Sequence, residues 1–292
     1  MKNNTRRSFL LSSALGVSGV VGLPTALAVN EQPAPAAKDG KSFTEPAQSL
    51  PLVGDADVIV CGAGPAGVSA AINAARAGAS VRLFETHGCL GGVWTAGLLG
   101  YLLDFNKPGF NQELMQRLRA RDAIRGKGLN ALCYEPEPMK LLLEELCLTA
   151  GVKFQLHTRV AAAYREGDRL TTIITESKSG RQAWRAPVFI DASGDGDLGA
   201  QAGCEFEIGE AHDCPCQPMS MDALLVVKEA AALKKFIHNG GLGDGRDELR
   251  QEIRRAGFDP SYGKPTLFLI RDNLLLVMMN HGTASNLSTP PK

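Results

Sequence analysis

Three glycines and one acid have the spacing of a turn that binds a dinucleotide. Gly62, Gly64 and Gly67 follow the apolar run 58–61, and Glu85 closes a second apolar run, 81–84. Gly62 permits a tight turn, Gly64 lets a pyrophosphate approach the backbone, and Gly67 lets a helix pack close to the strand. Free N–H groups in the first turn of that helix favour an anion. The Glu85 carboxylate can accept hydrogen bonds from a ribose and would repel a 2′-phosphate, which favours FAD or NAD over NADP.

The elements that must position these residues follow from the hydrophobic pattern. The runs 58–61 and 81–84 predict buried parallel strands, and the Ala-rich segment 65–77, stopped by Gly78, predicts the helix that connects them. We expect further helices over 111–121 and 137–150, a strand over 153–157, a three-stranded antiparallel meander over 160–165, 170–176 and 182–186, and a short buried strand over 188–190. The predicted fold class is α/β, with a Rossmann-like domain whose parallel sheet carries an antiparallel β-meander.

The composition excludes several classes of protein. The 292 residues include 31 basic and 31 acidic side chains, so the formal net charge is zero, and no basic field suggests nucleic acid as a partner. The sequence has seven cysteines, an odd number, and contains no C-x-x-C motif. We expect most of the cysteines to pack in the apolar core rather than form disulfides.

The N-terminus has the pattern of a targeting segment. Arg6-Arg7 precede a mildly apolar stretch, 9–23, and Ala26-Leu27-Ala28 form a small-residue cleavage site. Residues 1–28 resemble a bacterial twin-arginine (Tat) signal peptide, which implies the Tat export machinery as a partner, cleavage after Ala28 and a periplasmic or extracytoplasmic location. A membrane anchor is the alternative, but glycines interrupt the stretch and Pro24 closes it, so we expect no stable membrane span after cleavage. The Pro-containing segment 29–54 predicts a flexible linker.

The pattern changes after Gly209. An apolar run, 224–227, and two expected strands, 267–270 and 274–279, indicate the start of a second, α+β domain for the substrate. We therefore divide the chain into the signal peptide, the linker, a cofactor-binding domain over 55–212, a partial substrate domain over 213–282 and a polar tail over 283–292.

The order of motifs resembles the bacterial FAD-dependent oxidoreductases of the glutathione-reductase-like fold. The resemblance spans roughly residues 55 to 280 and rests on the 62–67 turn, Gly91-Gly92, the Pro-Glu-Pro-Met-Lys segment 136–140, the meander and Asp-Ala-Ser-Gly-Asp-Gly-Asp-Leu at 191–198. It implies that FAD is the cofactor. It further implies that the ADP half is held by Gly62, Ala63, Gly64, Pro65, Ala66, Gly67 and Glu85, the pyrophosphate and flavin by Gly91, Gly92 and Thr95, the adenine by the backbone of Val160, and the ribitol side by Ala192, Ser193, Gly194 and Asp195.

Several other motifs in the sequence do not fit the sites that their spacing suggests. The spacing Gly194-x-Gly196-x-x-Gly199 lacks the helix and acid of an NAD site, and the calcium-loop mimic that starts at Asp191 has Ala202 at its twelfth position instead of Glu. His212, Cys214 and Cys216 offer three metal ligands without a fourth, so we expect a loop and no metal site. Cys89 is expected to pack in its loop. Among five scattered histidines, His281 is the best candidate for a catalytic acid or base.

The expected activity is hydride transfer between a small-molecule substrate and flavin N5, with reoxidation by an unidentified electron acceptor. Members of the resembling family continue past residue 292 with a part that completes the flavin pocket, so the resemblance implies a C-terminally truncated chain. The alternatives are a non-catalytic flavin- or nucleotide-binding domain, an FAD-dependent isomerase or hydratase without net redox chemistry, and an NAD-dependent dehydrogenase.

Overall fold

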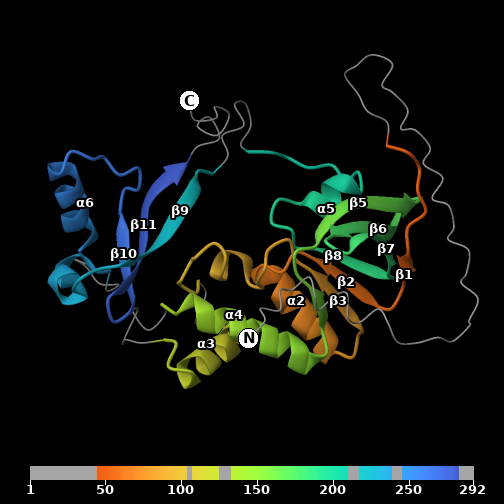
Figure 1. The fold of residues 1–292 in the computed structure, drawn as a ribbon, viewed down its shortest axis with the longest axis horizontal. Helices are drawn as coiled ribbons and strands as arrows, with labels where there is room; N and C mark the ends of the chain where they lie inside the picture. Colours follow the sequence, from red (N-terminus) through yellow and green to blue (C-terminus); the bar gives the residue numbers. More distant parts are fainter. Residues whose placement is uncertain (1–44, 104–106, 125–132, 210–216, 239–244, 283–292) are drawn as a thin grey trace, which may run out of the picture. The chain divides into compact units, whose positions relative to one another are not determined.

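A computed structural model describes residues 45–103, 107–124, 133–209, 217–238 and 245–282 (Figure 1). The chain divides into two units, 1–49 and 50–292, and every element below belongs to the second. The signal peptide, most of the linker, the polar tail and the His212–Cys216 motif lie outside the described residues. The described helices include none that is long and apolar enough to cross a membrane.

A four-stranded parallel sheet forms the centre of the segment 58–191. Its order is β4 (Lys153–Gln155), β3 (Val81–Phe84), β2 (Val58–Cys61) and β8 (Val188–Asp191). Helix α2 (Pro65–Arg76) connects β2 to β3, and it packs with α4 (Pro136–Ala150) and α3 (Phe110–Ala120) into one apolar core. The predicted strand–turn–helix–strand unit is therefore confirmed, with bounds that differ by only a residue or two.

The other face of the parallel sheet is covered by an antiparallel sheet. Strands β5 (Arg159–Glu166), β6 (Arg169–Ser177) and β7 (Gly180–Arg185) form the predicted meander. Ile59 and Cys61 of β2 pack on this side, with Ile173 and Trp184, whereas Val60 packs on the helical side. Burial on both faces explains why the run 58–61 is continuously apolar instead of alternating.

The predicted linker needs a correction at its C-terminal end. Leu52–Val53 form strand β1, which pairs in parallel with β7 at Ala183 and Trp184. The Ala183 N–H also donates to the carbonyl of Pro51, at 2.8 Å. Two apolar residues next to a proline are too short a pattern to predict a strand. Their extended conformation depends on pairing with β7, which lies far along the chain.

A separate three-stranded antiparallel sheet follows, with the order β10 (Thr266–Arg271), β11 (Leu274–Gly282) and β9 (Met219–Val226). The 3-10 helix η3 (Ala230–Phe236) and α6 (Arg246–Arg255), neither of which the sequence pattern predicted, pack on one face through Ala230 and Leu249. The other face packs against Cys133 and Tyr101. Strand β9 is an edge, and Met221 and Val226 remain 74% and 77% exposed.

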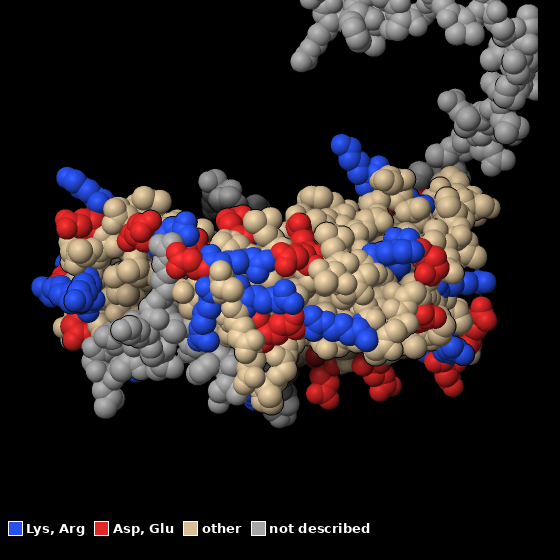
Figure 2. Space-filling view, turned by 90° about the horizontal axis from the view of Figure 1, so that it is seen from below, with Lys and Arg blue, Asp and Glu red and all other residues tan. Residues whose placement is uncertain are grey.

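Two short helical pieces also occur among the described residues: η1 (Gly92–Trp94), which follows β3, and α5 (Asp197–Gln201), which follows β8. Acidic and basic side chains alternate over the face shown in Figure 2, without a large area of one sign. This distribution agrees with the zero net charge of the sequence.

Candidate cofactor-binding site

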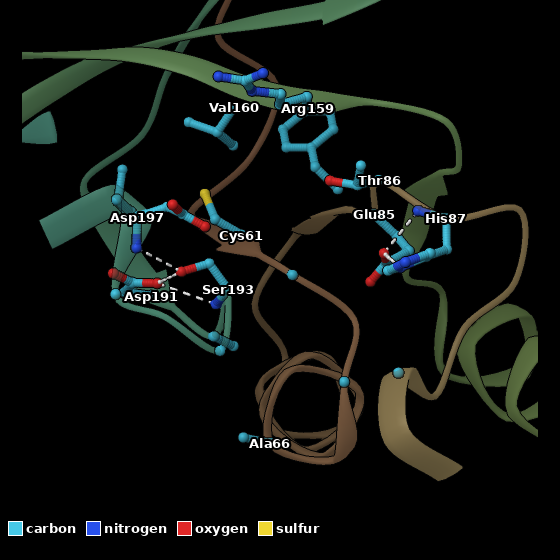
Figure 3. Close-up of a pocket in the computed structure, with 18 of the residues that line it drawn as sticks. Cys61, Ala66, Glu85, Thr86, His87, Arg159, Val160, Asp191, Ser193 and Asp197 are labelled. Atoms are coloured by element: carbon cyan, nitrogen blue, oxygen red, sulfur yellow. Dashed lines mark hydrogen bonds and ion pairs between the residues drawn. The ribbon is translucent and has the colours of Figure 1, made fainter. Parts of the chain in front are cut away.

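A large cavity lies at the carboxyl ends of β2, β3 and β8, where ligands bind in open α/β sheets (Figure 3). Its volume is about 1140 Å³, slightly above the usual range for small-molecule sites. Ten of the predicted site residues line it: Gly62, Gly64, Pro65, Ala66, Glu85, Gly92, Val160, Ala192, Ser193 and Gly194.

Each of the three glycines of the turn is required for a different structural reason. Gly62 has φ +95°, and a Cβ there would lie 2.2 Å from the Ala192 carbonyl oxygen. A Cβ on Gly67 would lie 1.9 Å from the Gly62 oxygen, so only glycine lets α2 approach the strand. A Cβ on Gly64 would meet no protein atom within 4 Å, although this residue lines the cavity. The space beside Gly64 is thus left open for a ligand.

Helix α2 presents to this space an N-terminus without a side-chain cap. Gly64 is its N-cap and supplies no side-chain hydrogen bond, Pro65 stands in its first turn, and that turn contains no acidic residue. The first N–H groups of a helix have no intrahelical partner, and together with the helix dipole they attract anions. Their position beside Gly64 fits a pyrophosphate group.

Glu85 is held in a network of hydrogen bonds at the end of β3. The side chain is buried; its Oε2 accepts from the Ala63 N–H at 2.7 Å, and its Oε1 accepts from the His87 N–H at 2.8 Å. The His87 Nδ1 lies 2.9 Å from the same Oε1 (Figure 3). These contacts fix the carboxylate at the cavity wall, and a carboxylate has about four acceptor positions, so one remains for a ribose hydroxyl.

The glycine-rich loop after β3 is fastened to the turn and to a buried tyrosine. The Gly91 N–H donates to the Ala63 carbonyl at 2.7 Å, and a Cβ on Gly92 would lie 2.8 Å from the Gly64 Cα. The Tyr134 hydroxyl lies 2.9 Å from the Trp94 carbonyl and 2.7 Å from that of Leu99. Burial raises the pKa of Tyr134, which therefore stays a donor. Sequence reasoning missed Tyr134, because a single aromatic residue between elements carries no periodic signal.

Asp191 organises the loop that closes the opposite side. Its Oδ1 accepts from the Ser193 N–H and hydroxyl, at 3.0 and 2.6 Å, and its Oδ2 accepts from the Gly199 N–H at 2.8 Å. Burial raises the pKa of Asp191, but these hydrogen bonds outweigh burial and leave the pKa below its usual value. The charged carboxylate thus shapes the loop that carries Gly194, whose φ is +96° and whose missing Cβ faces open space.

Five predicted site residues do not line the cavity: Ala63, Gly67, Gly91, Thr95 and Asp195. Ala63, Gly67 and Gly91 support the lining backbone through the contacts described above. Thr95 is fully buried, and its hydroxyl donates to the Leu90 carbonyl at 2.5 Å, so its side chain stabilises the loop. Residues that the sequence did not single out also line the cavity, among them His87, Arg159 and Gln201.

The catalytic candidate His281 lies elsewhere. It belongs to β11, is absent from the cavity lining, and stacks on Tyr262 with ring centroids 3.6 Å apart. Within the described ranges, no group of His, Cys, Asp and Glu side chains could hold a metal ion. Cys61, Cys133 and Cys147 are buried, as expected, whereas Cys204 is exposed and Cys89 is half-buried.

Comparisons with known proteins show the family and the fold of this chain. The family model described as FAD dependent oxidoreductase matches residues 57–281. A geranylgeranyl bacteriochlorophyll reductase-like protein from Thermoplasma acidophilum is similar in structure, with a TM-score of 0.51 and 15% identity over 80% of this chain and 58% of that one. CabE, an aromatic hydroxylase from angucycline biosynthesis, has a TM-score of 0.51 and 19% identity over 82% of this chain and 46% of its own. No curated protein sequence matches. The chain spans about half the length of these structures.

Proposed function

Because this chain belongs to the FAD-dependent oxidoreductase family and its cofactor is FAD, we propose that it transfers a hydride between a small-molecule substrate and flavin N5. FAD supplies the redox chemistry when bound, and the protein supplies binding, orientation and exclusion of competing reactions. We also propose that the electron acceptor is a separate molecule. By the same proposal the chain is exported by the Tat machinery, loses residues 1–28 and acts outside the cytoplasm.

One observation carries the binding part of this proposal: the open space beside Gly64 at the uncapped N-terminus of α2. A cradle without a Cβ, lined by free N–H groups, suits the two negative charges of a pyrophosphate. Glu85 at the end of β3 suits the adenosine ribose, and Gly92, Val93, Ala96 and Gly97 also line the cavity, where the flavin would extend. These residues bind and orient the cofactor; they supply no acid or base.

The absorbance spectrum of the freshly purified full chain, from the near ultraviolet to the blue, tests the proposal. We expect flavin bands that reductants bleach, and release of FAD on denaturation. A protein that stays colourless after incubation with FAD would refute the assignment. Turnover of a substrate without any electron acceptor would instead select a non-redox isomerase or hydratase.

A further inference from the structure

The cavity wall next to Val160 contains two polar side chains that none of the contacts above uses. Gln201, the last residue of α5, and Arg159, the first residue of β5, both line the cavity; Arg159 precedes Val160 in the strand, and Gln201 contacts its carbonyl. We propose that they read the adenine base of the cofactor, Gln201 by its edge and Arg159 by its face. This inference rests on the proposed binding of FAD.

The place of the base follows from the two fixed points of the site. A pyrophosphate at the N-terminus of α2 and a ribose at Glu85 direct the base onward from β3. The start of β5 lies next to the end of β3, because the Thr158 N–H donates to the Glu85 carbonyl at 2.8 Å. Thr86, His87, Thr158, Arg159 and Val160 line this end of the cavity, and Figure 3 shows Arg159 and Val160 as neighbours on β5.

Only one of the two polar groups of the Gln201 amide makes a hydrogen bond to a described residue. Its Nε2 donates to the Val160 carbonyl at 3.2 Å, whereas its buried Oε1 has no hydrogen-bond partner among the described residues. A buried polar atom without a partner is uncommon and often marks the place of a missing ligand or water. The terminal torsion of glutamine is broad, so a small rotation turns the oxygen toward the cavity.

The chemistry of an amide matches adenine. A glutamine side chain can accept from the exocyclic amino group of adenine and donate to a neighbouring ring nitrogen. Hypoxanthine carries a carbonyl oxygen where adenine carries that amino group. The Val160 carbonyl keeps the amide nitrogen of Gln201 in place and opposes a flip of the amide, so its oxygen would meet the hypoxanthine acceptor. Gln201 therefore predicts selectivity for adenine over hypoxanthine.

Arg159 is the one Lys or Arg side chain among the described residues that line the cavity. It is exposed, and within the described part of the chain no ion pair joins it to Glu176, its partner in the β5–β6 register. A guanidinium group without an acidic partner is free to lie flat on an aromatic base, as arginine does more readily than lysine. Arg159 would thus cover the face of the base whose edge Gln201 reads.

Calorimetric titration of the full chain with ADP and with inosine diphosphate tests the inference, since the two ligands differ only in the base. We expect the wild type to bind ADP about 5- to 150-fold more tightly, and Gln201→Leu to bring the ratio of the two Kd values close to one. Gln182→Leu, on β7 and outside the cavity, is the matched control and should keep the wild-type ratio.

Arg159→Leu should weaken both ligands by about 3- to 30-fold and leave their ratio unchanged. Arg159→Lys should be nearly as weak, because it keeps the charge and loses the planar group. Equal wild-type affinity for the two ligands, or an unchanged ratio in Gln201→Leu, would overturn the edge reading; wild-type affinity in Arg159→Lys would overturn the stacking. A wild type that binds neither ADP nor FAD would refute the proposed function itself.

Discussion

Gly64 separates the binding of the cofactor from the stability of the fold. Its φ of −65° and ψ of −174° are open to any residue, and a Cβ there meets no protein atom within 4 Å. In Gly64→Ala, the poorer N-cap costs roughly 0.5–1 kcal/mol, and the loss of conformational freedom in the unfolded chain offsets it by about 0.4–1 kcal/mol. We expect the free energy of unfolding of the apoprotein to change by less than about 0.5 kcal/mol.

The same methyl group would occupy space that the pyrophosphate needs. Overpacking of this size costs about 1–3 kcal/mol, so the Kd for FAD should rise by about 5- to 150-fold, and Gly64→Val should abolish retention. Denaturant unfolding of the apoprotein and titration with FAD by fluorescence quenching measure the two effects. Gly54→Ala, with equally open space outside the cavity, is the matched control, whereas Gly67→Ala should lose about 3 kcal/mol of stability through its 1.9 Å contact. Wild-type FAD affinity in Gly64→Ala would show that the pyrophosphate does not lie at α2.

Three further predictions concern the framework. Hydrogen bonds and ion pairs with Arg82 and, to a smaller extent, Lys153 hold the pKa of Asp55 well below its usual range. Asp55→Asn should therefore lower the free energy of unfolding at pH 7 by about 1 kcal/mol, measured by denaturant unfolding. A carboxyl group with a depressed pKa stabilises the fold only above its unfolded pKa, so the difference from wild type should shrink as the pH falls below about 4. Tyr134→Phe removes the one hydroxyl proton that the Trp94 and Leu99 carbonyls share, and it should cost about 1–3 kcal/mol in the same assay; an unchanged midpoint would contradict its role in holding the loop. Iodoacetamide at mildly alkaline pH should label Cys204 of the native protein and spare Cys61, Cys133 and Cys147, because burial raises the pKa of each of these three thiols to about 12; peptide mass mapping that finds them equally labelled would refute this.

The spacing of residues alone predicted only the part of the site that lies in contiguous residues, whereas Val160 and residues 192–194 were implied by the family resemblance. The Gly62–Gly67 turn, its two strands and Glu85 lie within one short segment, and their spacing alone determines what a turn and a helix N-terminus can bind. The sequence did not predict Tyr134 or Gln201 as site residues. Tyr134 contacts Trp94 and Gln201 contacts Val160, and in each pair the two residues are about forty positions apart in sequence. The same holds for β1, whose partner β7 lies far along the chain.

Strand β9 is less buried among the described residues than its apolar sequence would lead one to expect. The run 224–227 is continuously apolar, as in a strand covered on both faces. Its neighbours on β11, Leu275 and Leu276, are fully buried, yet their register partners Leu225 and Leu224 are 49% and 39% exposed. The central strand β11 is covered on both faces, whereas β9, at the edge of the same sheet, leaves its apolar side chains partly exposed. An apolar edge of this kind is prone to pair with other strands, so self-association of the purified chain should depend on β9 before any other described strand.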